Sequence, residues 1–237
     1  EISCSLVGSE MCIRDRWIEV QLFQKGDIHL MKTKGYIGGE VDMRKKSHIS
    51  LAWYLMNSEG MDALKLHKGS FYMGSVLPDC MPSFLVRRHT IEDSFEVLEK
   101  EFQKLVSHFD PKKGINCYFC RHLGMITHYV SDYFTFPHNA NYPGNLKDHC
   151  IYEEELKKEL RAYVHSPEAI RKRKKLGMQT PDDILTMIRQ MHNRYLQMES
   201  VVMRDCQYII ELCHRVVDAI LCLLESLSAA KISVALQ

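Results

Sequence analysis

Apolar residues recur three and four positions apart through most of the chain after residue 47. Such spacing places them on one face of an α-helix, where they pack against a core. The stretch 201–227 shows the pattern best, with apolar residues at Ile209, Leu212, Val216, Val217, Ile220, Leu223, Leu224 and Leu227. No segment alternates apolar and polar residues as a half-buried strand does, and no sequence repeat is evident. The pattern predicts a single all-α domain.

Residues that favour helix ends set the expected boundaries. Ser47, Thr90 and Thr180 are N-cap residues, and Pro181 stands at the favoured first helical position. Pro78 ends the helix before it, because proline lacks the backbone N–H that a helix interior needs. The predicted helices cover residues 47–57, 61–77, 91–109, 124–133, 147–163, a segment from 166 onward, a segment from 181 onward, and 201–227.

Composition and charge narrow the classes of protein. The chain has 237 residues, 46% of them hydrophobic, and a net charge of +1, which fit a globular domain and give no electrostatic reason for a stable nucleic-acid partner. No apolar run approaches the ~20 residues that a membrane-spanning helix needs, and no signal peptide is evident. Nine irregularly spaced cysteines argue against a disulfide framework. We expect a cytoplasmic, monomeric protein.

The first part of the chain differs in character from the rest. Residues 1–16 resemble a translated sequencing adapter, and residues 17–42 show no clear periodicity. The run Gly38-Gly39-Glu40 shortly before Met43 matches a purine-rich ribosome-binding site read in frame. We therefore expect residues 1–42 to be a non-native leader of adapter-like and untranslated sequence, and residues 43–237 to be the native domain.

Histidine and acidic residues are concentrated between residues 128 and 153. His128 and Asp132 stand four apart in a predicted helix, as do His149 and Glu153, so each pair lies on one helix face. His138 lies in the loop between them, directly after a proline. A single such pair is mostly a surface pair, but two pairs with a histidine between them favour metal binding. Mixed imidazole and carboxylate ligands are typical of zinc sites.

Three further residues occupy positions that suit metal ligands. His48 lies near a helix start, Asp79 lies in a turn bracketed by two prolines, and His89 lies in a loop after two arginines. The histidines that stand singly among charged or apolar neighbours are expected to be structural or surface residues; they are His67, His108, His165, His192 and His214.

Two other motifs have plain structural interpretations. Cys117-x-x-Cys120 lacks a second such pair and a βαβ context, so packing explains it better than redox or metal chemistry. The basic run 171–175 is expected to be a solvated helical face, with a surface for an anionic partner as the alternative.

The order of these candidate ligands resembles the signature of the bacterial zinc-dependent phospholipase C family. That signature is matched by His128-Tyr129-x-x-Asp132, His138, Asn141 and His149-x-x-x-Glu153, with Ser131 where Gly or Thr is usual. The family's upstream Ser-His and its Asp followed by His correspond to Ser47-His48, Asp79 and His89. The resemblance covers residues 48–153. It implies the all-α fold shared by these phospholipases and by zinc nucleases, extended to about residue 227.

The resemblance also implies two or three zinc ions. One ligand set would be Asp79, His89, His128 and Asp132, a second would be His138, His149 and Glu153, and a third would be His48 with Asp132 as a bridge. In the family an N-terminal Trp completes the third site. Here Trp17 lies in the expected leader and Trp53 follows His48. His122 points away from the ligand face of a regular helix and is expected to be a supporting or packing residue.

The implied activity of residues 43–237 is hydrolysis of a phosphodiester, foremost a phospholipid, by metal-activated water. Asp79 is expected to orient or deprotonate that water in addition to binding metal. Two alternatives stay open: a zinc-dependent single-strand nuclease of the same fold, which needs base-stacking aromatics and a basic groove, and a non-catalytic zinc-binding helical module.

Aromatic residues near the ligands bear on the substrate. Tyr133, Phe134 and Phe136 either line an acyl or head-group pocket or pack in the core. Choline-type recognition in the family uses aromatics beside the Asp and shortly before the following His. Cys80 and Val86 stand at those places here, so no choline selectivity is expected.

Overall fold

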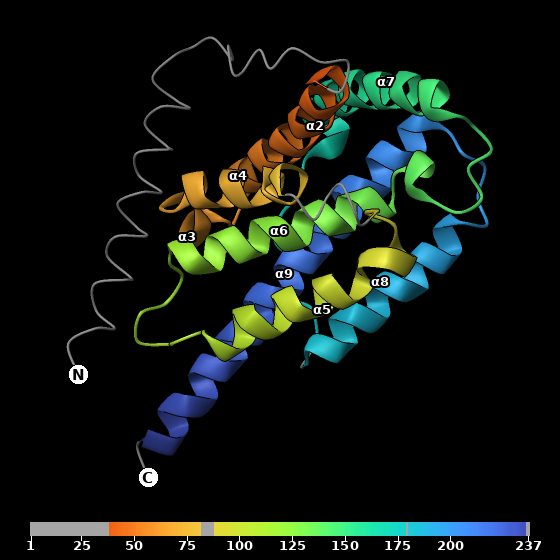
Figure 1. The fold of residues 1–237 in the computed structure, drawn as a ribbon. Helices are drawn as coiled ribbons and strands as arrows, with labels where there is room; N and C mark the ends of the chain where they lie inside the picture. Colours follow the sequence, from red (N-terminus) through yellow and green to blue (C-terminus); the bar gives the residue numbers. More distant parts are fainter. Residues whose placement is uncertain (1–37, 82–87, 179, 236–237) are drawn as a thin grey trace. The chain divides into compact units, whose positions relative to one another are not determined.

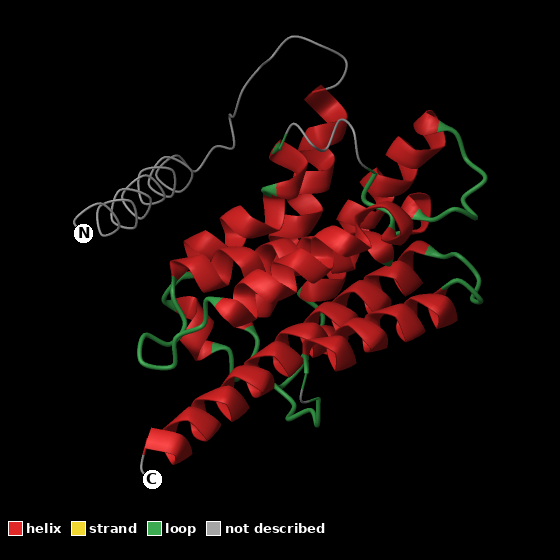
Figure 2. Ribbon diagram, turned by 60° about the horizontal axis from the view of Figure 1, so that its bottom comes forward, coloured by secondary structure: helices red, strands yellow, loops and turns green. Residues whose placement is uncertain are grey.

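The computed structural model describes residues 38–81, 88–178 and 180–235, and the regular elements in these ranges are all helices (Figure 2). The α-helices are α2 (Gly38–Asn57), α3 (Asp62–Lys65), α4 (Lys68–Val76), α5 (Ile91–Ser107), α6 (Cys117–Tyr133), α7 (Leu146–Val164), α8 (Pro181–Tyr195) and α9 (Val202–Ala235). The 3-10 turns are η1 (Pro78–Cys80), η3 (Phe136–His138) and η4 (Pro167–Ala169). The predicted all-α class is confirmed. Residues 1–37 of the expected leader lie outside the described residues, and the expected boundary after residue 42 falls within α2; the leader stays a prediction.

Side-chain caps fix several helix starts where the sequence places a small polar residue. The Thr90 hydroxyl oxygen accepts a hydrogen bond from the backbone N–H of Asp93 at 3.2 Å, at the start of α5. Asn145 and Thr180 form capping boxes with the acidic residues three positions later, at the starts of α7 and α8. These local hydrogen bonds satisfy N–H groups that have no partner inside the helix.

Five sequence predictions about helix boundaries are wrong. α6 begins at Cys117 instead of residue 124, and α9 continues to Ala235 instead of residue 227. α2 begins at Gly38 and continues through Ser47, so Ser47 is not an N-cap. The helix expected over 61–77 is divided into α3 and α4, which are separated at Leu66 and His67. After Ser166 only the three-residue turn η4 forms. Local capping preferences are weak beside packing, which decides whether a helix continues.

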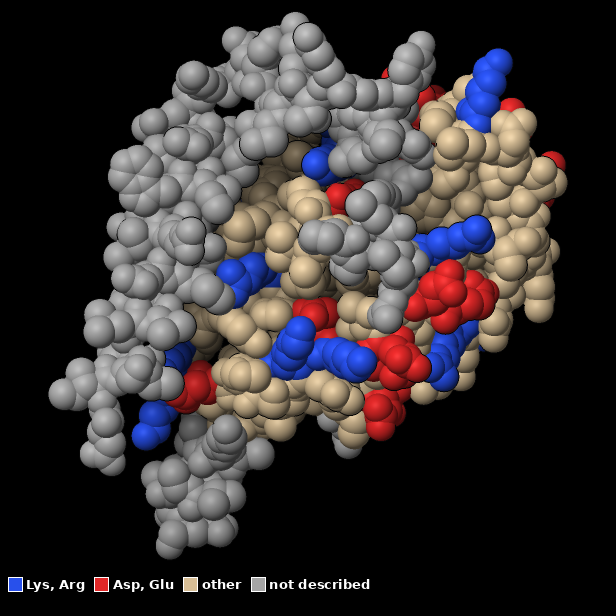
Figure 3. Space-filling model, viewed as in Figure 1, with Lys and Arg blue, Asp and Glu red and all other residues tan. Residues whose placement is uncertain are grey.

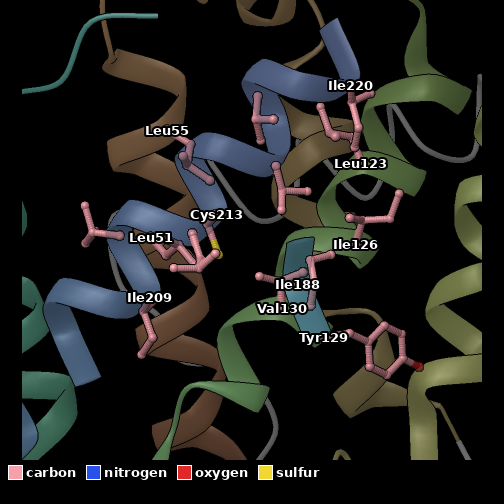
Figure 4. Packing of buried hydrophobic residues seen from close by; sticks show 14 of the residues in the cluster. Leu51, Leu55, Leu123, Ile126, Tyr129, Val130, Ile188, Ile209, Cys213 and Ile220 are labelled. Atoms are coloured by element: carbon pink, nitrogen blue, oxygen red, sulfur yellow. The ribbon is translucent and has the colours of Figure 1, made fainter. Parts of the chain in front are cut away.

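The core forms around α6, which packs against α4, α5 and α9 (Figure 1). Figure 4 shows how side chains of different helices interdigitate there, with Leu55 from α2, Leu123 and Ile126 from α6, Ile188 from α8 and Ile220 from α9. Each of these side chains is at most 1% exposed. None of the described helices is long and apolar enough to cross a bilayer.

Two glycines bring α4 and α6 unusually close together. A Cβ atom on Gly74 would lie 2.0 Å from the backbone oxygen of Arg121, and one on Gly124 would lie 2.3 Å from that of Phe71. Both distances are shorter than any van der Waals contact, so only glycine fits at either position. The close contact places the C-terminal end of α4 against the middle of α6.

The basic run 171–175 is a strap across α9, not the solvated helical face that the sequence predicts. Arg171 pairs with Glu211 at 3.1 Å, and Arg173 pairs with Glu225 at 2.8 Å. Between them, the backbone N–H of Lys174 donates to the buried carboxylate of Asp218 at 2.8 Å. The three acids stand seven positions apart, so they share one face of α9. These contacts with the acids of α9 favour a non-helical conformation of residues 171–175.

Candidate metal centre

Two of the candidate ligands come from consecutive turns of α6. His128 is 0% exposed and Asp132 is 4% exposed, and the imidazole Nε2 lies 3.2 Å from carboxylate oxygen Oδ2. Both side chains therefore share one helix face, as their spacing of four predicts. A charged side chain this deeply buried requires partners of opposite charge or a metal ion.

Asp79 and His89 approach the same face of α6 from the segments around the gap in the described residues. Oδ1 of Asp79 lies 3.7 Å from His128 Nε2 and 3.7 Å from His89 Nδ1. His89 Nδ1 lies 2.9 Å from Asp132 Oδ2. The turn η1 aims Asp79 inward, and His89 directly precedes the cap of α5. Asp79, His89 and His128 form the first ligand group, with donor atoms all within 4.8 Å of one another.

A second ligand group forms between η3 and α7. His149 and Glu153 lie one turn apart on α7, with 2.8 Å between Nε2 and Oε1. His138 reaches the same carboxylate oxygen from η3, with its Nε2 at 3.2 Å. The donor atoms of His138, His149 and Glu153 again lie within 4.8 Å of one another.

His48 completes a third ligand group with His128 and Asp132. Its imidazole stacks on that of His128, with 3.9 Å between ring centroids, and its Nε2 lies 3.3 Å from Asp132 Oδ1. α2 contributes this residue. All of the candidate ligands predicted from the sequence are thus brought together in these three groups.

The Asp132 carboxylate lies between the groups. Its Oδ2 faces His89 and His128, and its Oδ1 faces His48 at 3.3 Å and His138 at 3.8 Å. Burial raises the pKa of this carboxyl, but His128, His48 and His138 outweigh it and hold the pKa well below its usual range. One carboxylate thereby connects all three groups, so its loss affects each of them.

Three donor atoms of the cluster fit a metal better than they fit hydrogen bonds. Both carboxylate oxygens of Asp79, and Nδ1 of His138, are buried without a hydrogen-bond partner in the described part of the structure. Imidazoles face the Asp79 oxygens, and the Asp132 carboxylate faces Nδ1 of His138, at 3.7 to 3.9 Å, which is too long for a hydrogen bond. Ligands about 2.0–2.2 Å from a tetrahedral zinc ion stand roughly 3.3 Å apart. Imidazole and carboxylate are also the donors that zinc takes with an open position for water.

Hydrogen bonds outside the groups fix the orientation of two imidazoles. His128 donates from Nδ1 to the backbone oxygen of Ser75 at 2.8 Å, which leaves the lone pair of Nε2 facing the cluster. Ser131 donates its hydroxyl hydrogen to the His128 carbonyl at 2.8 Å, so it accepts from His48 Nδ1 at 3.1 Å. His48 consequently also presents Nε2 to the cluster. The sequence gives no signal for the Ser75 contact, because any residue supplies a backbone oxygen.

A buried carboxylate on α9 ties together the elements of the second group. Asp205 is 0% exposed and accepts hydrogen bonds from the backbone N–H of Phe136 at 2.8 Å, from the Tyr152 hydroxyl at 2.8 Å and from the Tyr195 hydroxyl at 2.7 Å. Burial raises the pKa of Asp205 to about 6, although these three hydrogen bonds lower it. Phe136 begins η3, which carries His138, and Tyr152 directly precedes a ligand of α7. Sequence reasoning did not single out Asp205.

A small cavity adjoins the second and third groups. Its volume is about 30 Å³, which is room for a water molecule. The polar side of the lining includes His48, Asp132, His138 and Glu153, and its apolar side consists of Leu51, Leu156, Leu160 and Ile209. Apolar backing lowers the local dielectric constant, which strengthens the attraction between the carboxylates and a bound cation.

Other residues considered from the sequence lie apart from the ligands. His122 forms a buried ion pair with Glu101 and therefore packs rather than supports the cluster. Tyr133 and Phe134 are 0% exposed in the core, which favours their packing role over a pocket lining. Trp53 lies against His165, with 4.5 Å between ring centroids. Val86 lies outside the described residues.

The surface charge gives no separate indication that the protein binds an anionic polymer. Over the described part of the face in Figure 3, basic and acidic side chains are interspersed, and neither sign gathers into a groove. In the basic strap, the side chains of Arg171 and Arg173 pair with acids of α9, and Lys172 pairs with Glu59. These features leave the ligand cluster as the chemically distinctive part of the described chain.

Comparison with known proteins agrees with the geometry. Residues 47–215 match the family model for zinc-dependent phospholipase C. The matched segment covers more than half of the chain and contains all of the candidate ligands. No curated protein and no solved structure shows significant similarity to the chain. On the strength of the family match, the chain belongs to the zinc-dependent phospholipase C family.

Proposed function

We propose that this protein hydrolyses the phosphodiester of a phospholipid, releasing the phosphorylated head group. The observation that supports the proposal most directly is the convergence of three ligand groups on Asp132. A purely structural zinc ion is enclosed by four protein ligands. The eight donors here are shared among three groups, so each ion would keep a position for a phosphate oxygen or for water.

The chain's own residues would hold the ions in a fixed, water-poor setting. Zinc bound here would neutralise the charge of the phosphate and lower the pKa of an attacking water. Asp79, His89 and His128 would hold one ion, and His138, His149 and Glu153 another, with Asp132 shared. His48 would hold a third together with Asp132. The oriented imidazoles keep their donor atoms in place before any substrate binds, so no rearrangement is needed at the reacting phosphate.

Asp79 is the residue to which we assign proton transfer. Both of its oxygens are buried and make no hydrogen bond in the described part of the structure, so their capacity to accept one is unused. A carboxylate within hydrogen-bond reach of the attacking water orients it and accepts its proton. Nδ1 of His89 and Nε2 of His128 each lie 3.7 Å from Oδ1 of this carboxylate.

The test is a comparison of substrates with the full chain. We expect release of phosphorylated head group from mixed micelles of phosphatidylcholine and phosphatidylethanolamine, and no cleavage of single-stranded DNA. Asp79→Asn should lower kcat by about 10²–10⁴-fold. The matched control is Asp62→Asn, which changes an exposed carboxylate on α3 and should leave kcat unchanged.

Each competing function predicts a different result. Cleavage of single-stranded DNA without lipid hydrolysis would assign the site to a nuclease. A zinc-loaded protein that is inert toward both substrates would be a non-catalytic zinc-binding module. Equal loss of activity in Asp79→Asn and Asp62→Asn would remove Asp79 from the mechanism.

A further inference from the structure

The N-terminal end of α6 carries two cysteines that the metal centre does not use. Cys117 is the first residue of the helix, and Cys120 lies one turn further along. Asn116 caps this end by accepting a hydrogen bond from the backbone N–H of Phe119 at 3.0 Å. The N–H groups of a first turn give the helix end a partial positive charge, which stabilises a thiolate relative to a thiol.

A histidine lies beside the first of these cysteines. Nδ1 of His67 is 3.3 Å from Sγ of Cys117, across the interface between the start of α4 and the start of α6. Both side chains are half-buried, so a small reagent reaches them from solvent. An imidazole at hydrogen-bond distance accepts the thiol proton or stabilises the thiolate, which is the nucleophilic form of cysteine.

The second cysteine has the opposite character. Cys120 is 0% exposed. Burial first, and then the neighbouring Cys117 thiol, raise the pKa of Cys120 to about 12. An accessible thiol in an electropositive setting is therefore followed, one turn later, by a buried thiol that stays protonated. A bound metal does not account for the arrangement, because His67, Cys117 and Cys120 are not among the groups of described residues whose donor atoms converge within 4.8 Å.

We propose that Cys117 and Cys120 form a reversible redox site, in which Cys117 attacks a low-molecular-weight disulfide and Cys120 resolves the adduct. The inference is independent of the metal centre and of the proposed hydrolysis. The nearest candidate ligand on the same helix is His128, which stands two turns beyond Cys120.

The reaction balances in two exchange steps. In the first, the Cys117 thiolate attacks one sulfur of the external disulfide, a bond forms between the two sulfurs, and the other half leaves as a thiolate that takes up the proton held by His67. In the second, the Cys120 sulfur attacks Sγ of Cys117, and its proton passes to the sulfur of the departing half, which leaves as a second thiol. Two protein thiols are oxidised to one disulfide, and the external disulfide is reduced to two thiols.

The backbone of the first turn of α6 can accommodate a disulfide between Cys117 and Cys120. Residues three apart in a helix have Cβ atoms about 5–6 Å apart, whereas a disulfide needs roughly 3.5–4.5 Å. Closure therefore requires the first turn of α6 to tighten. The first turn is the part of a helix that can do so, because its N–H groups have no partners within the helix.

The experiment treats the full chain with oxidised glutathione, blocks the remaining thiols by alkylation and maps the cysteines by mass spectrometry. We expect a peptide with a Cys117–Cys120 disulfide, reversed by dithiothreitol. Cys120→Ser should retain one glutathione on Cys117, because the resolving thiol is gone. Cys117→Ser should acquire neither product at this place. Cys150→Ser is the matched control for loss of a half-buried cysteine and should behave as the unmodified chain.

A second measurement separates the role of His67 from an effect on folding. Alkylation of Cys117 by iodoacetamide at pH 7 should be roughly tenfold faster than that of Cys150, and His67→Gln should remove most of the difference. Circular dichroism should show the same helix content and Tm for His67→Gln as for the unmodified chain. The proposal is overturned if Cys117 and Cys150 react at equal rates, or if Cys120→Ser carries no glutathione on Cys117.

Discussion

The imidazole Nδ1 of His128 lies 2.8 Å from the backbone oxygen of Ser75. This hydrogen bond connects the C-terminal part of α4 to the candidate ligand at the centre of α6, and it fixes which nitrogen of His128 faces the cluster. It exists only because α4 and α6 are in contact at Gly74 and Gly124. The backbone of α4 therefore belongs to the support of the metal centre, and a change in the spacing of the two helices should disturb zinc binding.

Substitution of Gly124 by alanine tests this support. The new Cβ atom would lie 2.3 Å from the backbone oxygen of Phe71, so α4 must move away from α6. We expect Gly124→Ala to lower the free energy of unfolding by about 1–3 kcal/mol, the usual effect of overpacking a core. We also expect weaker zinc binding although every ligand is retained. Urea denaturation and zinc titration measure the two effects.

The control for this substitution is Gly177→Ala. Gly177 is exposed and does not have a left-handed backbone. A Cβ atom added to it would have no other atom within 4 Å. The change should alter stability by no more than about 0.5 kcal/mol, as surface substitutions usually do. Normal zinc affinity in Gly124→Ala would mean that the helix spacing does not position His128.

Asp205 should make stability depend on pH in a particular direction. Its folded-state pKa of about 6 lies above the usual 3.8, so the folded protein holds this proton more tightly than the unfolded chain does. The stabilisation is then complete below about pH 4 and is lost as the pH rises through 6. The difference between 3.8 and about 6 corresponds to roughly 3 kcal/mol.

Asp205→Asn isolates that contribution, because an amide does not titrate. The free energy of unfolding of the unmodified chain minus that of the variant should fall between pH 4 and pH 6.5 and then level off. Urea denaturation at half-unit steps of pH measures it. A constant difference over this range would show that the carboxyl is not perturbed. Because Asp205 holds η3 and α7, the variant should also bind zinc more weakly at the second group.

The strap 171–175 offers a comparison of buried and exposed ion pairs. Asp218 is 1% exposed; it accepts a hydrogen bond from the backbone N–H of Lys174 and lies 3.2 Å from Nδ1 of His214, whereas the carboxylate of Glu225 is 57% exposed beside Arg173. Asp218→Ala should lower the free energy of unfolding by about 3 kcal/mol, because it leaves buried donors without a partner. Glu225→Ala should change it by less than about 1 kcal/mol. Thermal or urea denaturation distinguishes the two; equal effects would show that burial does not set the contribution.

Chelation should destabilise the fold as well as stop catalysis. Without a cation, the buried oxygens of Asp79 have no hydrogen-bond partner in the described structure, and Asp132 is balanced by imidazoles alone. A free zinc concentration 100-fold above Kd stabilises the folded state by about 3 kcal/mol for each site. EDTA should therefore lower Tm by several degrees, and zinc should restore it. An unchanged Tm would mean that zinc binding does not stabilise the folded chain.

Local sequence signals predicted the parts of the fold and site that depend on local geometry. The spacing of His128 and Asp132, and of His149 and Glu153, places each pair on one helix face, and the structure has both pairs so arranged. Thr90 caps its helix as predicted, since the hydrogen bond spans only three residues. Such relationships follow from the helix repeat and need no knowledge of the tertiary fold.

Contacts between distant parts of the chain could not be predicted in this way. Asp205 reaches Phe136 across 69 positions, and its neighbours in sequence give no hint of that contact. The sequence of the basic strap alone predicts a helical face, because the acids of α9 become its neighbours only in the tertiary fold. Ser47 fails as a cap because the residues before it continue the helix. In each case tertiary packing overrides a local preference.

The measurement that tests the account most directly is the zinc content of the purified chain, with Asp132→Asn and Glu153→Gln measured beside it. Asp132 faces all three ligand groups and Glu153 only the second. We predict two or three zinc ions per unmodified chain, loss of more than one in Asp132→Asn, and loss of one in Glu153→Gln, with helix content retained throughout. One zinc ion or none, unchanged by Asp132→Asn, would contradict the clustered site and with it the proposed hydrolase.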